Sequence, residues 1–145
     1  MLMTTYAEIF KLALRKIDDP SLVQWPEEDL SNELYGWLQS SIAKLPQLRA
    51  ETAERDAFDP KDIEVIGFAT DLSDVTKEVL ALGMKREWLA PQIASTTLTW
   101  QQFSRKEGFS QKEHLAGLMA LDESVKLEIK KLLRDDTYVD SEYFD

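Results

Sequence analysis

The sequence has 145 residues, no cysteine and one histidine, and its 27 acidic and 17 basic residues give a formal net charge of −10. This length suits a single domain, and the lack of cysteine excludes disulfide scaffolds, thiol catalysis and cysteine-ligated zinc. The negative charge disfavours binding to nucleic-acid phosphates, because that binding needs clustered lysine and arginine.

Two amphipathic helices are predicted in the first third of the chain. The first opens with a capping box, in which Thr5 is the N-cap and Glu8 follows three residues later. Apolar residues then recur at helical spacing until the helix ends before Pro20. The second helix starts at Pro26, where proline and the three acids that follow suit a first turn, and it ends before Pro46. We expect these two helices to form an antiparallel hairpin.

The next segment, residues 47–68, is an acidic excursion from the helical pattern. Residues 47–62 are polar, charged and without a period, so they are predicted to form an exposed loop. The apolar patch that follows, residues 63–68, is short and rich in β-branched side chains. Periodicity leaves open whether this patch forms one strand or an extended segment that packs on the core.

Two more helices are predicted in the second half of the chain. The third begins with Ser73 as its N-cap and should bend near Pro91. Residues 92–103 continue it weakly, because serine and threonine are poor helix formers. A glycine-bearing turn then precedes Ser110, which opens a second capping box and the longest helix, to about Arg134.

The last residues, 135–145, are predicted to form an extended tail. Asp135 and Asp136 oppose the negative C-terminal end of the helix dipole, so the helix should not continue past Arg134. Four apolar or aromatic residues of the tail could anchor it on another protein, by strand addition or in pockets: Tyr138, Val139, Tyr143 and Phe144.

The predicted fold class is therefore all-α. We expect a small bundle of about four main helices over residues 1–134, with an acidic middle loop and an extended C-terminal tail. No apolar run has the length that a membrane-spanning helix needs, so no membrane contact is predicted.

Motifs for catalysis are missing from the sequence. The five glycines stand apart, so the chain has neither a phosphate-binding loop nor a dinucleotide fingerprint. The adjacent carboxylate pairs lack calcium-loop spacing, and His114 is expected to be a partly exposed polar residue. We therefore predict a protein that is not an enzyme, with no cofactor and no metal ligand.

A pattern of packing and capping residues runs through the second half of the chain. In order, it consists of Leu82, Trp88, Leu89, Pro91, Ile93, Phe109, Ser110, His114, Leu115, Leu118, Leu121, Glu128, Leu132, Leu133, Asp135 and Tyr138. Over about residues 72–138 this pattern resembles the head–tail connector, or adaptor, proteins of long-tailed bacteriophages.

The resemblance implies a structural protein of the virion neck, between capsid and tail, that is assembled in the host cytoplasm. In that family a small helical bundle repeats in a ring, typically twelvefold, beneath the portal protein. DNA passes through the ring without specific binding, and a stopper or tail-completion protein lies below. By position after the last helix, residues 135–145 would dock onto the portal through the four tail residues named above.

The resemblance also makes the acidic excursion a candidate for contact with a neighbouring subunit or with the DNA channel. Its candidate residues are Glu51, Glu54, Asp56, Asp59, Ile63, Val65 and Phe68. Residues 47–74 hold eight acids and three bases, whereas residues 75–134 hold ten bases and seven acids. Unlike charges of this kind suit head-to-tail contacts around a closed ring.

The alternative function is a small acidic inhibitor or regulatory protein that imitates DNA. In that case the carboxylates themselves would be the functional groups, and they would form one rigid face. About half of the net charge instead lies in residues 135–145, which the sequence predicts to be a tail. An enzyme with carboxylate ligands for a metal ranks behind both.

Overall fold

The computed structural model describes the backbone of residues 3–102 and 105–144, and the side chains of residues 3–98 and 112–135. The elements in chain order are α1 (Tyr6–Lys16), η1 (Pro20–Gln24), α2 (Glu27–Ala43), η2 (Pro46–Leu48), α3 (Arg49–Thr52), α4 (Asp74–Gln102) and α5 (Arg105–Phe144). The described residues form α-helices and short 3-10 turns but no strand, which confirms the all-α prediction.

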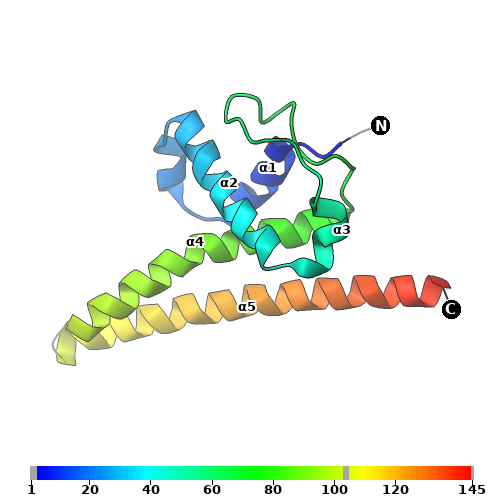
Figure 1. Ribbon diagram of the computed structural model, residues 1–145. Helices are drawn as coiled ribbons and strands as arrows, with labels where there is room; N and C mark the ends of the chain where they lie inside the picture. Colours follow the sequence, from blue (N-terminus) through cyan, green and yellow to red (C-terminus); the bar gives the residue numbers. More distant parts are fainter. Residues whose placement is uncertain (1–2, 103–104, 145) are drawn as a thin grey trace.

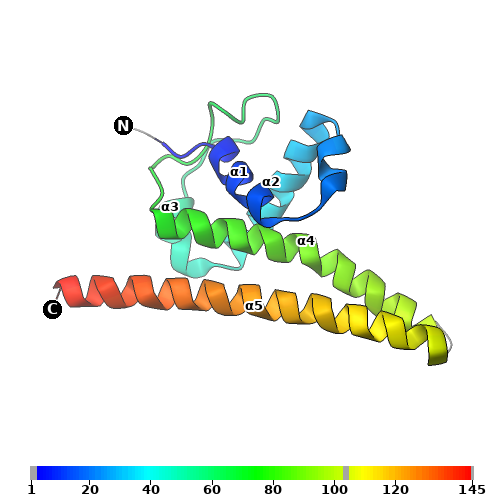
Figure 2. The ribbon, with the colours of Figure 1, turned by 180° about the vertical axis from the view of Figure 1, so that it is seen from behind.

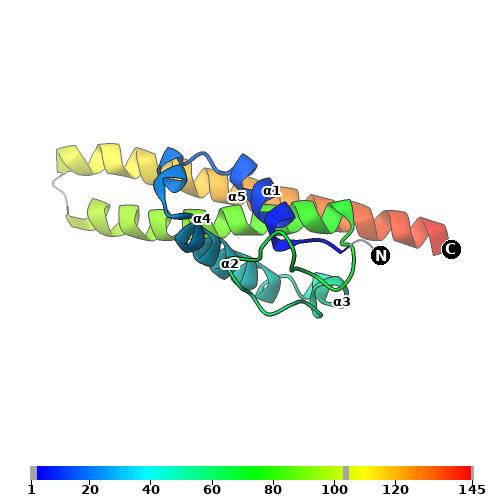
Figure 3. The same ribbon diagram turned by 90° about the horizontal axis from the view of Figure 1, so that it is seen from above.

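The two longest helices, α4 and α5, form a hairpin that carries the rest of the molecule (Figure 1). Helices α1 and α2 lie on the side of α4 that faces away from α5, as the reverse view also shows (Figure 2). The sequence predicts that α1 and α2 pair with each other, but both pack mainly against α4. Seen from above, α1 lies over the hairpin, whereas α2 and α3 lie beside α4 on the side away from α5 (Figure 3).

The core lies where α1 and α2 meet the first half of α4. Its large, fully buried side chains come from α1, α2, α4 and the excursion: Tyr6, Ile9, Leu38, Phe68, Val79, Leu80 and Met84. Val125 and Ile129 add the buried face of α5 to the same cluster. Because both faces of α4 are covered here, this helix is apolar all round between Val79 and Met84.

The structure confirms the predicted starts of α1 and α4. The Thr5 hydroxyl accepts a hydrogen bond from the Glu8 amide at 3.3 Å, and the Ser73 hydroxyl accepts one from the Thr76 amide at 3.2 Å. Helix α4 then continues through Pro91 to Gln102, and it curves along its length (Figure 1). The curvature agrees with the predicted bend, since proline removes one backbone hydrogen bond from a helix.

Helix α5 is longer than predicted at both ends. It begins at Arg105, within the predicted turn, and it continues through residues 135–144. The extended form predicted for the tail is therefore wrong for the backbone of these residues. A charge opposed to the dipole costs only about 0.3–1 kcal/mol, and no proline or glycine follows Gly117 to stop the helix. The side chains of the four tail candidates lie outside the described residues: Tyr138, Val139, Tyr143 and Phe144.

The acidic excursion is built into the bundle more than its composition suggests. It begins with η2 and α3, whose Leu48 and Thr52 are buried. Its apolar patch is not a strand. Residues 63–65 form a turn, and beyond it isolated bridges join Gly67 to Thr5 and Phe68 to Arg55.

Candidate functional site

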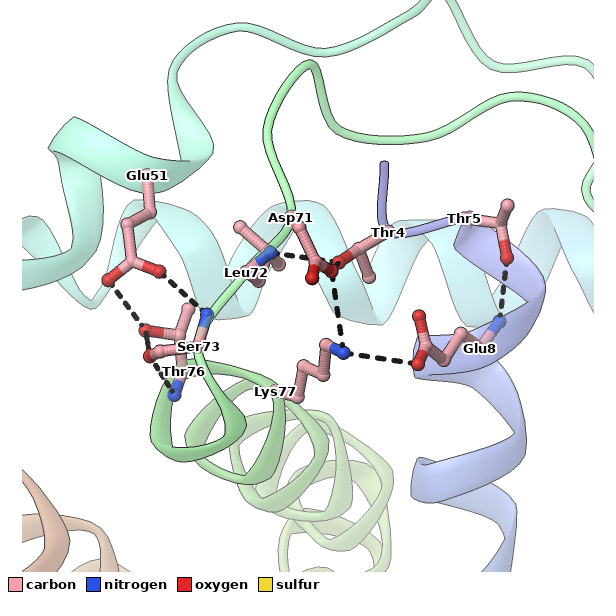
Figure 4. Close-up of polar contacts among 9 residues, drawn as sticks. All are labelled: Thr4, Thr5, Glu8, Glu51, Asp71, Leu72, Ser73, Thr76 and Lys77. Atoms are coloured by element: carbon pink, nitrogen blue, oxygen red, sulfur yellow. Dashed lines mark hydrogen bonds and ion pairs between the residues drawn. The ribbon is translucent and has the colours of Figure 1, made fainter. Parts of the chain in front are cut away.

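Polar contacts fix the base of the acidic excursion to the start of α4 (Figure 4). One carboxylate oxygen of Glu51 accepts a hydrogen bond from the Ser73 amide at 3.1 Å, and the other accepts one from the Thr76 hydroxyl at 2.9 Å. A carboxylate suits this place because it satisfies free N–H groups at the positive end of the helix dipole. Glu51, a predicted contact residue, is thus occupied within its own chain.

The N-terminal segment is tied to the same place (Figure 4). The Thr4 hydroxyl donates to Asp71 and accepts from the Leu72 amide, each at 2.9 Å. Lys77 of α4 donates to Glu8 at 3.1 Å, and this hydrogen bond is the main reason why the lysine pKa is raised. Asp71 and Leu72, which follow the excursion, are therefore held by Thr4, and Lys77 of α4 adds an ion pair to Asp71 at 3.6 Å.

Two more of the predicted contact residues have partners within the chain. Phe68 is fully buried, and its ring packs edge-on to that of Tyr6 with centroids 5.7 Å apart. A carboxylate oxygen of Asp56 accepts from the Gly67 amide at 2.9 Å, and its carbonyl accepts from the Tyr6 hydroxyl at 2.5 Å. Burial raises the pKa of the Tyr6 phenol, so this hydroxyl remains a donor.

The exposed part of the excursion, residues 54–65, is named here the acidic loop. It carries five acids and two bases. Three carboxylates, those of Glu54, Asp62 and Glu64, are exposed and form no hydrogen bond or ion pair with the residues that the structure describes. Val65 is 72% exposed, which is unusual for a valine. Of the other predicted contact residues, Asp59 is also exposed, and Ile63 is half-buried.

A second surface, which we name the groove, lies between the end of α2 and the middle of α4 and α5. Its volume is about 580 Å³. The apolar part of its lining comes from all three sides: Leu45, Ala90, Ile93, Ala94, Ile129 and Leu133. The sequence patterns did not predict the groove, because it forms between distant segments. One signal was present: Gly83, Ala90 and Ala94 place small residues on one face of α4.

Charged residues surround the groove, and the positive ones are in excess. Two ion pairs cross it, one between Lys44 and Glu87 at 2.5 Å and one between Arg86 and Asp122 at 2.9 Å. The hydrogen bond to Asp122 raises the pKa of the Arg86 guanidinium, which therefore stays charged. Lys126 and Lys130 also line the groove, and neither forms an ion pair with the residues described.

One buried group beside the groove lacks a partner. The Ser41 hydroxyl oxygen is buried and has no hydrogen bond within the described part of the chain. It faces Gly83 of α4, where an added Cβ would lie only 1.9 Å from it. The glycine therefore allows α2 and α4 to approach closely at this point.

Ser41→Ala is expected to raise the free energy of unfolding by about 1 kcal/mol. The change removes a buried hydroxyl without a partner, whose desolvation costs about 1–3 kcal/mol, and alanine also favours the helix. Urea denaturation would measure the effect. Ser40→Ala is the control, because Ser40 is only half-buried and should gain no more than its helix propensity, about 0.5 kcal/mol. If Ser41→Ala instead lowered the free energy of unfolding, the Ser41 hydroxyl would have a hydrogen-bond partner in the folded chain, and the prediction would be wrong.

Comparisons of the chain with protein-family models, with curated proteins and with solved structures find no match. Among the residues described, no three histidine or carboxylate side chains gather where they could hold a metal ion. Within the same residues, none of the helices combines the length and apolar character needed to cross a bilayer. His114 is exposed on α5.

Proposed function

We propose that this chain is a head–tail connector, or adaptor, which forms a ring beneath the portal protein of a tailed bacteriophage and joins head to tail. The observation that carries the proposal is the place of the connector-like residues in the fold. They lie on α4 and α5, which pack together as one hairpin (Figure 1). Leu82, Leu89 and Leu115 of the pattern are buried. The resemblance thus covers one structural unit of the chain.

The two charged surfaces also support a ring. The acidic loop lies on the far side of α4 from α5 (Figures 1 and 2). The groove is lined by residues of α4 and α5 and by the end of α2. Two different surfaces of opposite charge suit a head-to-tail contact, and contacts of this kind close into rings when the rotation allows. A symmetric dimer would instead need one surface that matches itself.

The end of α5 is the portal-docking segment in this proposal. Residues 135–144 are helical, and this end of α5 extends past the start of α4 (Figure 3). Docking would therefore place a helix, rather than an added strand, against the portal.

The use of the carboxylates favours a connector over a DNA mimic. Several of them make contacts within the chain and are not free to imitate phosphates: Glu8, Asp19, Glu51, Asp56, Asp71, Glu78, Glu87 and Asp122. Hydrogen bonds from Ser21 and Trp88 even lower the pKa of Asp19, as expected for a carboxylate with a role in the fold. A mimic would need its carboxylates exposed on one face.

The purified chain is expected to bind the portal ring of the phage that encodes it, with twelve copies on each portal by native mass spectrometry. Tyr143→Ala combined with Phe144→Ala should weaken this binding at least tenfold, because each buried aromatic contributes about 1.5–3 kcal/mol. The matched control is Ser141→Ala combined with Glu142→Ala, which changes neighbouring polar positions and should bind normally. All variants should keep the helicity of the unaltered chain.

Two results would contradict the proposed function. The first is a chain that binds no portal and is absent from purified particles. The second is a chain that displaces DNA from a DNA-binding protein, which would favour the mimic.

A further inference from the structure

The groove has the composition of a binding surface for an acidic segment with an apolar side chain. Its floor is apolar, with Ile93 and Ile129 on facing helices. Lys126 and Lys130 on its rim have no ion-pair partner among the described residues, although two other ion pairs form close by. Lysines without partners at the edge of an apolar floor are complementary to carboxylates that flank an apolar residue.

The acidic loop has the matching composition. Val65 is 72% exposed, and the exposed carboxylates of Asp62 and Glu64 lie within three residues of it. Hydrogen bonds from the Val65 and Ile66 amides to the Asp62 carbonyl, at 2.9 and 3.0 Å, hold this part of the loop in a tight turn. The loop therefore presents its valine in a defined shape, which lowers the entropy lost on binding.

We propose that the groove receives the acidic loop of a second copy of this chain, with Val65 on the apolar floor and Asp62 and Glu64 beside Lys126 and Lys130. The inference rests on the proposed function, because it names the contact that joins neighbouring subunits of the ring. The loop cannot fill the groove of its own chain, since no residue of the acidic loop lines the groove and α4 separates the loop from α5 (Figure 1).

A nucleic acid fits the groove less well than the acidic loop does. Phosphate binding needs a cluster of cations without partners, and the apolar floor offers nothing to a phosphate backbone. Of the four cations that line the groove, Lys44 and Arg86 are already paired with carboxylates. The acidic loop instead offers carboxylates to the lysines of the groove and an apolar side chain to its floor.

Cysteine cross-linking can test the contact directly, because the natural chain has no cysteine. Two variants of the full chain are made, one with Val65→Cys and one with Ala90→Cys. They are mixed at high protein concentration and low salt in the presence of a mild oxidant. Ala90 is exposed and lines the groove. The expected product is a disulfide between the two variants, formed faster than in the controls.

Matched controls remove one surface at a time. Val23→Cys replaces the loop cysteine, since Val23 is 83% exposed but lies in η1, away from the acidic loop. Ala116→Cys replaces the groove cysteine, since Ala116 is exposed on α5 and does not line the groove. Combined in one chain, Val65→Cys and Ala90→Cys should give a ladder of oligomers. Cross-linking of Val65→Cys no faster than that of the controls would overturn the proposed contact.

Charge reversal gives a second, independent measurement. Lys126→Glu with Lys130→Glu should lower the cross-linking rate about tenfold, and a loop partner with Asp62→Lys and Glu64→Lys should restore it. Lys112→Glu with Lys131→Glu makes the same charge change on α5 outside the groove and should have little effect. If both double variants lowered the cross-linking rate equally, the proposed contact would be overturned.

The tests of the contact and of the function fail in different ways. Cross-linking is measured on the chain alone, and portal binding is measured with the portal present. Twelve copies on the portal without the Val65–Ala90 disulfide would leave the function standing and overturn this contact. The disulfide without portal binding would support the contact and contradict the function.

Discussion

Replacing Gly67 by alanine is expected to lower the free energy of unfolding by about 3–5 kcal/mol, enough to unfold a domain of ordinary stability in mild denaturant. An added Cβ would lie 2.1 Å from the Thr4 carbonyl oxygen and 2.6 Å from the Thr5 Cα. Both are backbone atoms, so no side chain can rotate to make room. The chain could relieve this overlap only by separating the excursion from the start of α1.

That separation would break hydrogen bonds on both sides of the glycine. The Tyr6 amide donates to the Ile66 carbonyl at 3.0 Å, and the Phe68 amide donates to the Thr4 carbonyl at 2.9 Å. Each such bond contributes about 1 kcal/mol, and breaking them would also expose Phe68. Urea unfolding followed by circular dichroism measures the change.

Gly36→Ala is the control for this prediction. Gly36 lies in α2, and an added Cβ there would meet nothing within 4 Å. Alanine should therefore stabilise the chain by about 0.5–1 kcal/mol, because glycine is a poor helix former. Equal stability of Gly67→Ala and the unaltered chain would show that the excursion does not pack against α1 in this way.

Phe68→Ala is the second large effect, with an expected loss of about 3–5 kcal/mol from the free energy of unfolding. Its side chain is 0% exposed and belongs to an aromatic cluster with Tyr6, so its removal leaves a cavity in the core. Val65→Ala, three residues earlier in the same apolar patch, is the matched control. Val65 is 72% exposed, so this change should alter stability by less than about 0.5 kcal/mol.

The pair also separates the two roles of the apolar patch. Phe68 should affect folding, whereas Val65 should affect self-association with little change in folding. Thermal unfolding and sedimentation velocity on the same two variants measure these effects. A stable Phe68→Ala variant, or a Val65→Ala variant that unfolds early, would contradict this division.

The features predicted correctly from the sequence are those that neighbouring residues determine. The start of α1 depends on Thr5 and Glu8, and the start of α4 depends on Ser73 and Thr76, all within one helical turn. Signals of this kind do not require knowledge of the rest of the chain.

The features missed depend on weak local signals or on distant contacts. The ends of α5 were missed because an unfavourable charge, or a single glycine such as Gly108, costs at most about 1 kcal/mol in a long helix. The sequence left the packing of Phe68 on the core open as one of two forms of its patch, because its partner Tyr6 lies far away in the sequence. The groove was missed for the same reason, since three separate helices line it.

The packing of α1 and α2 on α4, rather than on each other, has a consequence for synthesis on the ribosome. The contacts between α1 and α4 join residues as far apart as Glu8 and Lys77, 69 positions along the chain. Neither helix can bury its apolar face until the first half of α4 has emerged from the exit tunnel. The nascent chain therefore exposes these faces to chaperones during translation of its first half, and it folds only once α4 is available.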